Sequence, residues 1–240
     1  MQFVELQRDG PVAFVTNNRP DKRNAFSDAF ATQLWDAFEA AASDPSVRCI
    51  VWRANGPSFS AGRDVAELGK ARPNGATELA YIEQMQRRSQ VLLESPVPIL
   101  VALRGWVVGM ACEYALLGDL RIGARSARFW LPEAAHGAIP AAGGLARLFQ
   151  IAGQGLAMDM ALTGRVLHAD EALQLGVISR VVDDDELDGV ATEMAQRIAA
   201  LPASAVAMVC RDVRRMANPL VRDTMRDEAL LLAHAYAEKR

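Results

Sequence analysis

The chain has 240 residues, of which 51% are hydrophobic and 23% charged, and its 29 acidic and 26 basic side chains give a net charge of −3. This length and composition predict one globular domain with a substantial core, with room for a small appended unit, and leave no electrostatic footprint for nucleic-acid binding. The N-terminus lacks an export signal, and the longest apolar region is interrupted too early for a membrane span. Three cysteines within apolar runs indicate reduced thiols and no metal cluster. We therefore expect a cytoplasmic protein.

The first part of the chain alternates short strands with helices. Two β-branched runs flank Asp9-Gly10-Pro11, which is a hairpin signal, and Ser27 is placed to cap the first helix. Asp64 and Glu67 have the spacing of a capping box and predict a short helix. In chain order we expect strands at 3–7 and 12–16, a polar loop at 17–25, a helix at 27–42, a strand at 47–52, a glycine-rich loop at 54–64, a mobile loop at 70–78, a helix at 81–93 and a strand at 97–103.

Helices dominate the later part of the chain. Asn218-Pro219 is typical of a cap followed by a first-turn proline, so it predicts a division of the last helical region into two helices. We expect strands at 120–124, 128–133 and 177–182, and helices at 145–152, 155–162, 169–175, 184–200, 203–216 and 219–237. Strands alternating with helices, followed by helices alone, predict an α/β core with a helical C-terminal part.

The stretch from Gly105 to Asp119 is the most informative part of the sequence. Its glycines indicate a tight strand-to-helix turn, where backbone amides can approach a ligand closely. A helix that begins near Met110 presents its first free amides and the positive end of its dipole at this turn. One turn later, Glu113 is a single carboxylate on an otherwise apolar surface. Such a charge is costly unless it is paired, exposed or used, so Glu113 is either a structural ion-pair partner or a functional acid.

Five segments resemble the crotonase family, the enoyl-CoA hydratase/isomerase superfamily, and they occur in the family's order over roughly residues 1–217. They are the early CoA-contacting loop at 18–25, the first oxyanion-hole loop at 59–64, the glycine-rich signature at 105–119, the second catalytic segment at 131–144 and a further typical segment at 163–182. The resemblance implies an α/β fold with a ββα spiral core over 1–185 and a C-terminal helical region over 186–240. It also implies assembly into a homotrimer or hexamer.

The same resemblance implies the chemistry. Family members stabilise the enolate of an acyl-CoA thioester, so two backbone amides must point at the thioester oxygen. Carried over to this sequence, these amides belong to Arg63 and Met110, while Glu113 and Glu133 occupy positions where hydratases of the family place catalytic glutamates. The resemblance assigns Glu113 chiefly to the water and Glu133 chiefly to the α-carbon proton. The substrate contacts that it implies are Lys22, Ala25, Ala61, Asp64, Val65, Trp106, Gly109 and Pro132.

Three features depart from the family pattern. Met110 stands in a run that is normally glycine or alanine, and its side chain could reshape the acyl pocket or fill the core. Arg63 replaces a residue that is often small, and its side chain could meet a CoA phosphate, a polar acyl tail or water. The chain ends at Arg240, where relatives commonly carry another helical segment.

The pair of glutamates favours reversible addition of water across the 2,3-double bond of an enoyl-CoA, a reaction of fatty-acid metabolism. If both carboxyls face one water in an apolar pocket, their titrations are coupled and at least one pKa is raised. No metal or redox cofactor is implied, because coenzyme A is part of the substrate. Two alternatives stay open: another crotonase reaction, such as isomerisation or hydrolysis of a thioester or carbon–carbon bond, and a non-catalytic CoA-binding paralogue. Without catalysis, Asp64 is a helix cap, and Trp106 and Cys112 are packing residues.

Overall fold

The computed structural model describes residues 1–67 and 76–237, so most of the predicted loop at 70–78 lies outside the described residues. Its strands are Val4–Asp9 (β1), Val12–Asn17 (β2), Cys49–Ala54 (β3), Ile99–Leu103 (β4), Trp106–Val108 (β5), Leu120–Ala124 (β6), Arg128–Trp130 (β7), Leu167–His168 (β8) and Val181–Val182 (β9). They form a six-stranded sheet in the order β1-β2-β3-β4-β6-β9 and a three-stranded sheet in the order β5-β7-β8. The β1–β2 and β7–β8 pairs are antiparallel, and the other pairs are parallel.

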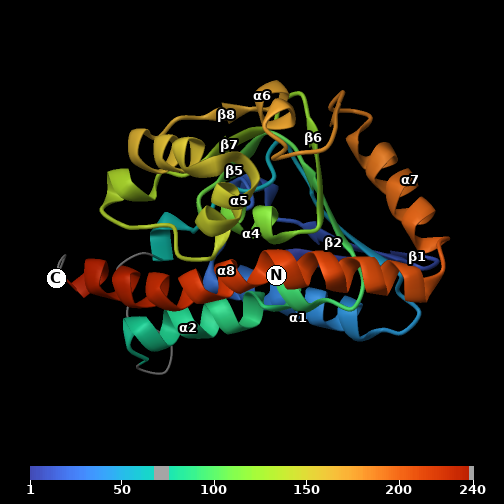
Figure 1. Cartoon of the computed structure of the whole chain (residues 1–240), viewed down its shortest axis with the longest axis horizontal. Coiled ribbons are helices and arrows are strands. Elements are labelled where there is room, and N and C mark those ends of the chain that lie inside the picture. Colours follow the sequence, from blue (N-terminus) through green and yellow to red (C-terminus); the bar gives the residue numbers. More distant parts are fainter. Residues whose placement is uncertain (68–75, 238–240) are drawn as a thin grey trace.

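Helices cover both faces of the larger sheet (Figure 1). The α-helices are Asp28–Ser43 (α1), Glu78–Ser89 (α2), Val91–Glu94 (α3), Met110–Leu117 (α4), Gly144–Met158 (α5), Ala169–Gln174 (α6), Leu187–Ala199 (α7) and Ala203–Ala237 (α8). Short turns of 3₁₀-helix lie at Pro20–Lys22 (η1), Val65–Glu67 (η2) and Glu133–His136 (η4), and a π-helical turn lies at Asp159–Thr163 (η5). The long helix α8 crosses the front of the molecule, with α2 alongside its C-terminal half (Figure 1).

Local sequence signals placed several of these elements. The predicted hairpin is β1–β2, and Ser27 caps α1 as predicted, with its hydroxyl accepting a hydrogen bond from the Phe30 N–H (3.2 Å). The predicted helix at 81–93 is instead two helices that meet at Gln90, and the strand expected at 177–182 contains only Val181–Val182.

The predicted break at Asn218-Pro219 was wrong, because α8 is continuous through Pro219. The Asn218 side chain does not cap a second helix. Its Nδ2 donates to the Leu93 carbonyl (3.0 Å), and its Oδ1 accepts from Arg147 (2.5 Å). These buried contacts with the end of α3 and with α5 hold the helix in place, so tertiary packing overrides the local preference for a break.

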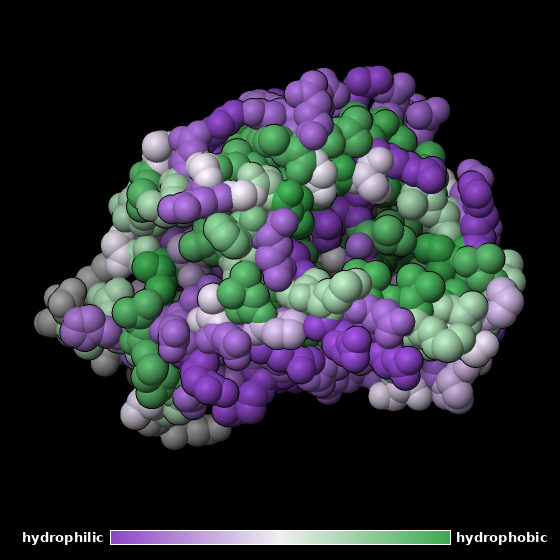
Figure 2. Space-filling model, in the orientation of Figure 1, coloured by the Kyte–Doolittle hydropathy of each residue, from purple (hydrophilic) through white to green (hydrophobic). Residues whose placement is uncertain are grey.

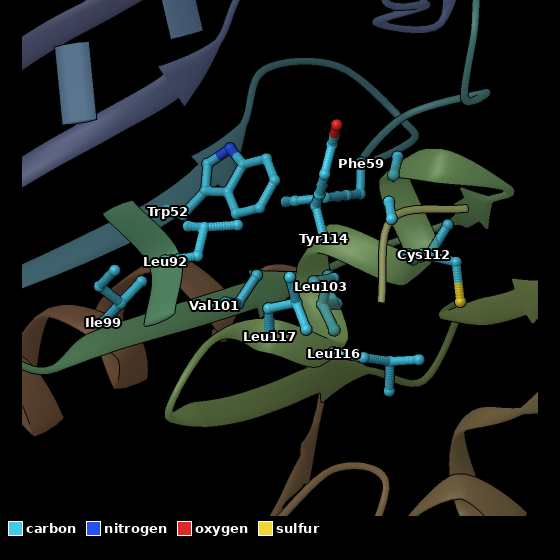
Figure 3. Close-up of a cluster of buried hydrophobic side chains, with 14 of the residues drawn as sticks. Trp52, Phe59, Leu92, Ile99, Val101, Leu103, Cys112, Tyr114, Leu116 and Leu117 are labelled. Atoms are coloured by element: carbon cyan, nitrogen blue, oxygen red, sulfur yellow. The ribbon is translucent and has the colours of Figure 1, made fainter. Parts of the chain in front are cut away.

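The main core lies between the larger sheet and helices α1, α3 and α4. Figure 3 shows Trp52 of β3 and Tyr114 of α4 in this core, together with leucines from α3, β4 and α4. The Trp52 indole N–H donates to Asn17 Oδ1 (2.9 Å), so its polar atom is satisfied. All residues from Ala111 to Leu117 are buried. Helix α4 is therefore a core helix, and the position of any functional group on it is fixed by packing on every side.

The opposite face of the larger sheet is covered by α7. Leu187, Ala191, Ala195 and Ala199 recur along one side of this helix and pack on β2, β3, β4 and β6. Beside the end of α7, an apolar groove of about 550 Å³ runs along the first half of α8, where Figure 2 shows a hollow with hydrophobic residues at its rim. Val209 and Val213 on this rim are 64% and 53% exposed. The division at residue 185 and the expected homotrimer or hexamer stay predictions.

An ion pair fastens α8 to the turn after α4. Arg214 Nε donates to Asp119 Oδ1 (2.7 Å) and Arg214 Nη2 to Asp119 Oδ2 (2.5 Å), while the same guanidinium donates to the carbonyls of Ser95 and Val97. Asp119 Oδ2 also accepts from the Ile99 N–H (2.8 Å). The two side chains are only 13% and 18% exposed.

Replacing Arg214 with methionine is expected to lower the free energy of unfolding by about 3 kcal/mol, because it leaves the shielded Asp119 carboxylate without its cation. The matched control is Arg222→Met on the same helix. Its partner is Glu94, and that pair is 48% and 58% exposed, so its loss should cost less than about 1 kcal/mol. Urea denaturation at pH 7 measures both. Equal losses in the two variants would contradict this account.

Candidate active site

Two segments lie side by side at the centre of the candidate site: the first loop, at 59–64, and strand β5 with the turn at Gly109 that follows it. The Ser60 N–H donates to the Trp106 carbonyl (3.0 Å) and the Val108 N–H donates to the Ser60 carbonyl (3.1 Å), so the first loop pairs with β5. Gly62 has a φ of +81°, and a Cβ there would lie 2.6 Å from the Val108 carbonyl oxygen. Only glycine permits this approach, which brings the peptide after Gly62 next to the peptide after Gly109.

The N–H groups at these two peptides belong to Arg63 and Met110. Within residues 1–67 and 76–237, neither N–H donates a hydrogen bond to a protein acceptor. Met110 is the first residue of α4, and no side chain caps this helix, so its N–H adds the positive end of the helix dipole. Two free donors on adjacent loops are the arrangement that stabilises negative charge developing on an oxygen.

Both predicted glutamates reach one cavity of about 120 Å³. Glu113 comes from α4 and Glu133 from the start of η4, and the side chains of Arg63 and Met110 share the same wall. Met110 also packs against the main core, as one of the two alternatives from the sequence predicted, and its effect on an acyl pocket stays a prediction. The remaining lining residues are Tyr81, Ile82, Met85, Gln86, Tyr114, Ala138, Ile139, Ala141, Ala142, Leu232 and Tyr236.

The Glu113 carboxylate is fixed by backbone amides and is 2% exposed. Its Oε2 accepts hydrogen bonds from the N–H groups of Ala142 (2.9 Å) and Gly144 (3.2 Å), and its Oε1 accepts one from Ala141 (3.2 Å). Burial raises the pKa of Glu113 well above its usual value, and the nearby carboxyls of Glu133 and Glu228 raise it further. The amide hydrogen bonds oppose this rise because they favour the ionised form.

Glu133 is held differently. A Cβ at position 109 would lie 2.6 Å from Glu133 Oε1, so Gly109 lets this carboxyl approach the turn that precedes Met110. Its Oε2 is buried and has no hydrogen-bond partner among the described residues. Burial raises the pKa of Glu133 to about 7. The prediction that at least one pKa of the pair is raised is confirmed, and the two environments give one fixed carboxyl and one that is free to bond a ligand.

Among the described residues, the Arg63 side chain contacts other protein groups, and the three contacts that the sequence left open for it stay predictions. Its guanidinium pairs with Asp28 (2.6 Å), donates to the Phe26 carbonyl (3.2 Å) and lies 5.7 Å from the centre of the Tyr81 ring. The side chain is thus held within the protein. The backbone N–H of the same residue has no protein acceptor in the described part of the chain.

None of the eight predicted substrate contacts is among the described residues that line the cavity, and their role in binding stays a prediction. Gly109 adjoins Glu133, and Pro132 directly precedes it. Asp64 accepts from Arg19 (2.7 Å) and from the Ala66 N–H (3.0 Å), which is the helix-cap role. Trp106 packs near Trp130 with ring centres 6.0 Å apart. Outside the described lining also lie the exposed residues Lys22 and Val65, together with Ala25 and Ala61.

Sequence reasoning did not identify Glu228 or Gln86. Glu228 lies on the charged helix α8, where nothing distinguishes it from its neighbours, yet its Oε2 accepts from the Gly143 N–H (3.0 Å). Burial raises the pKa of Glu228 to about 7. Local sequence patterns cannot predict either contact, because the partners of Gln86 and Glu228 in the loop lie 55 or more positions away in the chain.

Comparison with known proteins identifies the group to which this chain belongs. The model of the enoyl-CoA hydratase/isomerase family matches residues 7–240. The chain is a member of that family. Two relatives from Escherichia coli (strain K12) are a 2,3-dehydroadipyl-CoA hydratase, 36% identical over 83% of this chain and 76% of the relative, and a 1,2-epoxyphenylacetyl-CoA isomerase, 32% identical over 88% and 81%.

Solved structures agree with the family assignment. An enoyl-CoA hydratase/isomerase from Pseudoalteromonas atlantica T6c superimposes with a TM-score of 0.90 at 28% identity, covering 98% of this chain and 92% of that one. The predicted crotonase-like α/β fold is thereby confirmed. Members of the enoyl-CoA hydratase/isomerase family bind acyl-CoA substrates, so the cavity is a candidate acyl site. In the described ranges, no helix is long and apolar enough to cross a bilayer, and no group of three or more side chains could hold a metal ion.

Proposed function

We propose that this member of the family is an enoyl-CoA hydratase, which adds water reversibly across the 2,3-double bond of an acyl-CoA thioester. One observation carries the proposal: two carboxyls with raised pKa values share a small cavity beside two free backbone N–H groups. The N–H groups of Arg63 and Met110 would receive the thioester oxygen as it becomes an enolate oxygen. Losing one such donor typically costs about 3 kcal/mol of transition-state stabilisation.

In the proposed reaction the two glutamates carry one proton between them, so that Glu113 starts ionised and Glu133 starts protonated. The ionised Glu113 accepts a proton from water while the water oxygen bonds to C3, and the double-bond electrons move onto the thioester oxygen. Glu133 then donates its proton to C2, and the enolate returns to a thioester. The pair begins and ends with one proton, so both acids are restored by transfer of that proton from Glu113 to Glu133.

The cavity favours this singly protonated pair. Two ionised carboxylates in one apolar cavity repel each other, and burial penalises both charges. The three amide N–H groups stabilise the charge on Glu113, whereas Glu133 Oε2 has no such donor among the described residues. Hydration as proposed requires the shared proton on Glu133 and the charge on Glu113, where the amides can stabilise it, and the two macroscopic pKa values belong to the pair.

An isomerase is the second candidate, because one E. coli relative is a 1,2-epoxyphenylacetyl-CoA isomerase. An isomerase moves a proton or a bond without adding water, so a single acid at Glu133 suffices for it. The buried and hydrogen-bonded Glu113 would then have no chemical role. The presence of a second, shielded carboxyl supports hydration.

The deciding experiment is a screen of enoyl-CoA thioesters, beginning with crotonyl-CoA, with the product mass measured. We expect a product heavier than the substrate by one water, and the reverse reaction from the corresponding 3-hydroxyacyl-CoA. A product of unchanged mass would establish isomerisation, and a free acid with coenzyme A would establish hydrolysis. Calorimetric binding of acyl-CoA with no turnover of any thioester would establish a non-catalytic binding protein.

A further inference from the structure

The loop over residues 141–144 is the structural support of Glu113. Three of its four N–H groups, those of Ala141, Ala142 and Gly144, donate to the Glu113 carboxylate. The fourth, that of Gly143, donates to Glu228 on α8 (3.0 Å). Each N–H of the loop therefore binds one of two carboxylates, one in the core helix and one on the C-terminal helix.

The opposite side of the same loop is held by α2. Gln86, a buried residue, donates from its Nε2 to the Ala141 carbonyl (2.9 Å) and to the Met225 carbonyl of α8 (2.7 Å). One amide group thus ties the loop to both helices. The loop packs directly against α8 at Gly143, where a Cβ would lie 2.8 Å from a Val221 side-chain atom and 2.9 Å from one of Met225.

Loop geometry decides where the Glu113 carboxylate points. Helix α4 fixes the Glu113 backbone, but the carboxylate takes its orientation from the three N–H groups that bind it. A shift of the loop would carry those donors with it. Because a misplacement of about 1 Å can cost about 10²-fold in rate, residues that fix this loop matter to the reaction without touching the reacting atoms.

We propose that Gln86 and Glu228 are positioning residues, which hold the loop at 141–144 from α2 and α8 and thereby aim the Glu113 carboxylate at its water. The inference rests on the proposed hydratase function for its effect on rate. Neither residue is a catalytic residue. Glu228 acts by accepting the Gly143 N–H, and Gln86 acts by donating to the Ala141 carbonyl.

The test separates the hydrogen bond from the charge at position 228. Glu228→Leu removes the acceptor, whereas Glu228→Gln keeps an oxygen of similar reach for the Gly143 N–H. We expect Glu228→Leu to lower kcat for hydration at least tenfold with KM changed less than about threefold, and Glu228→Gln to retain kcat within about threefold of the wild type. Asp227→Leu is the matched control, because Asp227 is an exposed acid on the same helix.

Gln86→Leu provides an independent variant on α2, with the exposed Gln84→Leu as its control, and it carries the test alone if Glu228→Leu does not fold. We expect Gln86→Leu to lower kcat at least tenfold and Gln84→Leu to leave it unchanged. Unchanged kcat in both Gln86→Leu and Glu228→Leu would overturn the proposal. So would equal loss in Glu228→Leu and Glu228→Gln, since the charge rather than the hydrogen bond would then matter.

A second readout does not depend on the reaction. Amide hydrogen exchange across 141–144 should accelerate at least tenfold in Glu228→Leu and Gln86→Leu, but not in Glu228→Gln, while exchange across α7 stays unchanged. If the wild type hydrates no enoyl-CoA, the proposed function fails, and the exchange result still decides whether these residues hold the loop. Unchanged exchange in both leucine variants would overturn the positioning role even in an active hydratase.

Discussion

Glu133→Gln is expected to lower kcat for hydration by about 10³-fold and, at the same time, to stabilise the folded protein above pH 7. The loss of rate follows from removal of the group that donates a proton to the α-carbon, which is typically worth 10²- to 10⁴-fold, so about 10³ is a middle value. The gain in stability follows from the environment of this carboxyl. The residue is half-buried, and its Oε2 atom is buried with no partner among the described residues that would stabilise an ionised form.

The direction of the stability change follows from the pKa of Glu133. In the unfolded chain the carboxyl ionises near its ordinary value of 4.5, whereas burial raises the pKa in the folded protein to about 7. The unfolded state therefore releases its proton first as the pH rises. The native state loses stability between pH 4.5 and 7 and loses no more above that window. Removing the carboxyl should raise the free energy of unfolding at pH 8 by up to about 3 kcal/mol and change it little at pH 4.5.

Glu113→Gln is the informative comparison, since its expected effect on stability differs. Its carboxylate accepts three backbone N–H groups, and a glutamine has one acceptor oxygen for them. The amide NH₂ of that glutamine would face a backbone donor, which costs about 1–3 kcal/mol. We expect a similar fall in kcat, with a smaller gain in stability at pH 8 or a net loss.

Both variants are measured by hydration kinetics and by urea denaturation at pH 4.5 and pH 8. Full activity in Glu133→Gln would remove it from the mechanism. A Glu133→Gln protein less stable than the wild type at pH 8 would show that this carboxyl does not carry the burial penalty inferred from its surroundings.

Gly144→Ala is expected to have the largest effect on folding. A Cβ at this position would lie 2.2 Å from the Glu113 Cα and 2.4 Å from its Cβ, so helices α4 and α5 touch at this point. The obstacle is backbone, which no rotamer change can remove. The helices must separate, and we expect a loss of at least about 3 kcal/mol in the free energy of unfolding. Because the Gly144 N–H binds the Glu113 carboxylate, kcat should fall at least about 10²-fold in any protein that folds.

Gly155→Ala on the same helix is the control. Nothing lies within 4 Å of a Cβ at that position, so the change should alter stability by less than about 1 kcal/mol, with a gain expected from helix propensity. Thermal or urea unfolding monitored by circular dichroism measures both variants. Comparable stability of the two proteins would mean that the α4–α5 contact can relax without cost.

The sequence predicted the features that depend on neighbouring residues. Ser27 before an apolar helical repeat located α1, and the lone charge of Glu113 on an apolar helix marked the site, because burying an unused carboxylate is unfavourable. Strands β5 and β8 escaped prediction. They contain three and two residues, too few to show a period.

The missed parts of the site depend on contacts between distant segments. The loop amides reach Glu113 from 28 to 31 positions away, and Gly143 meets Glu228 across 85 positions. The continuity of α8 has the same origin. The Asn218 side chain bonds Leu93 of α3 and Arg147 of α5, and does not cap a turn of α8 itself. Local preferences describe none of these contacts, which exist only after the helices have packed.

The two free donors beside the cavity belong to the main chain, and this has an evolutionary consequence. Every residue except proline supplies the same peptide N–H, so the chain can exchange the side chains of Arg63 and Met110 without giving up either donor. Both side chains line the cavity wall. If the proposed oxyanion hole is correct, divergence at these two positions would reshape the cavity wall while both N–H donors are inherited unchanged.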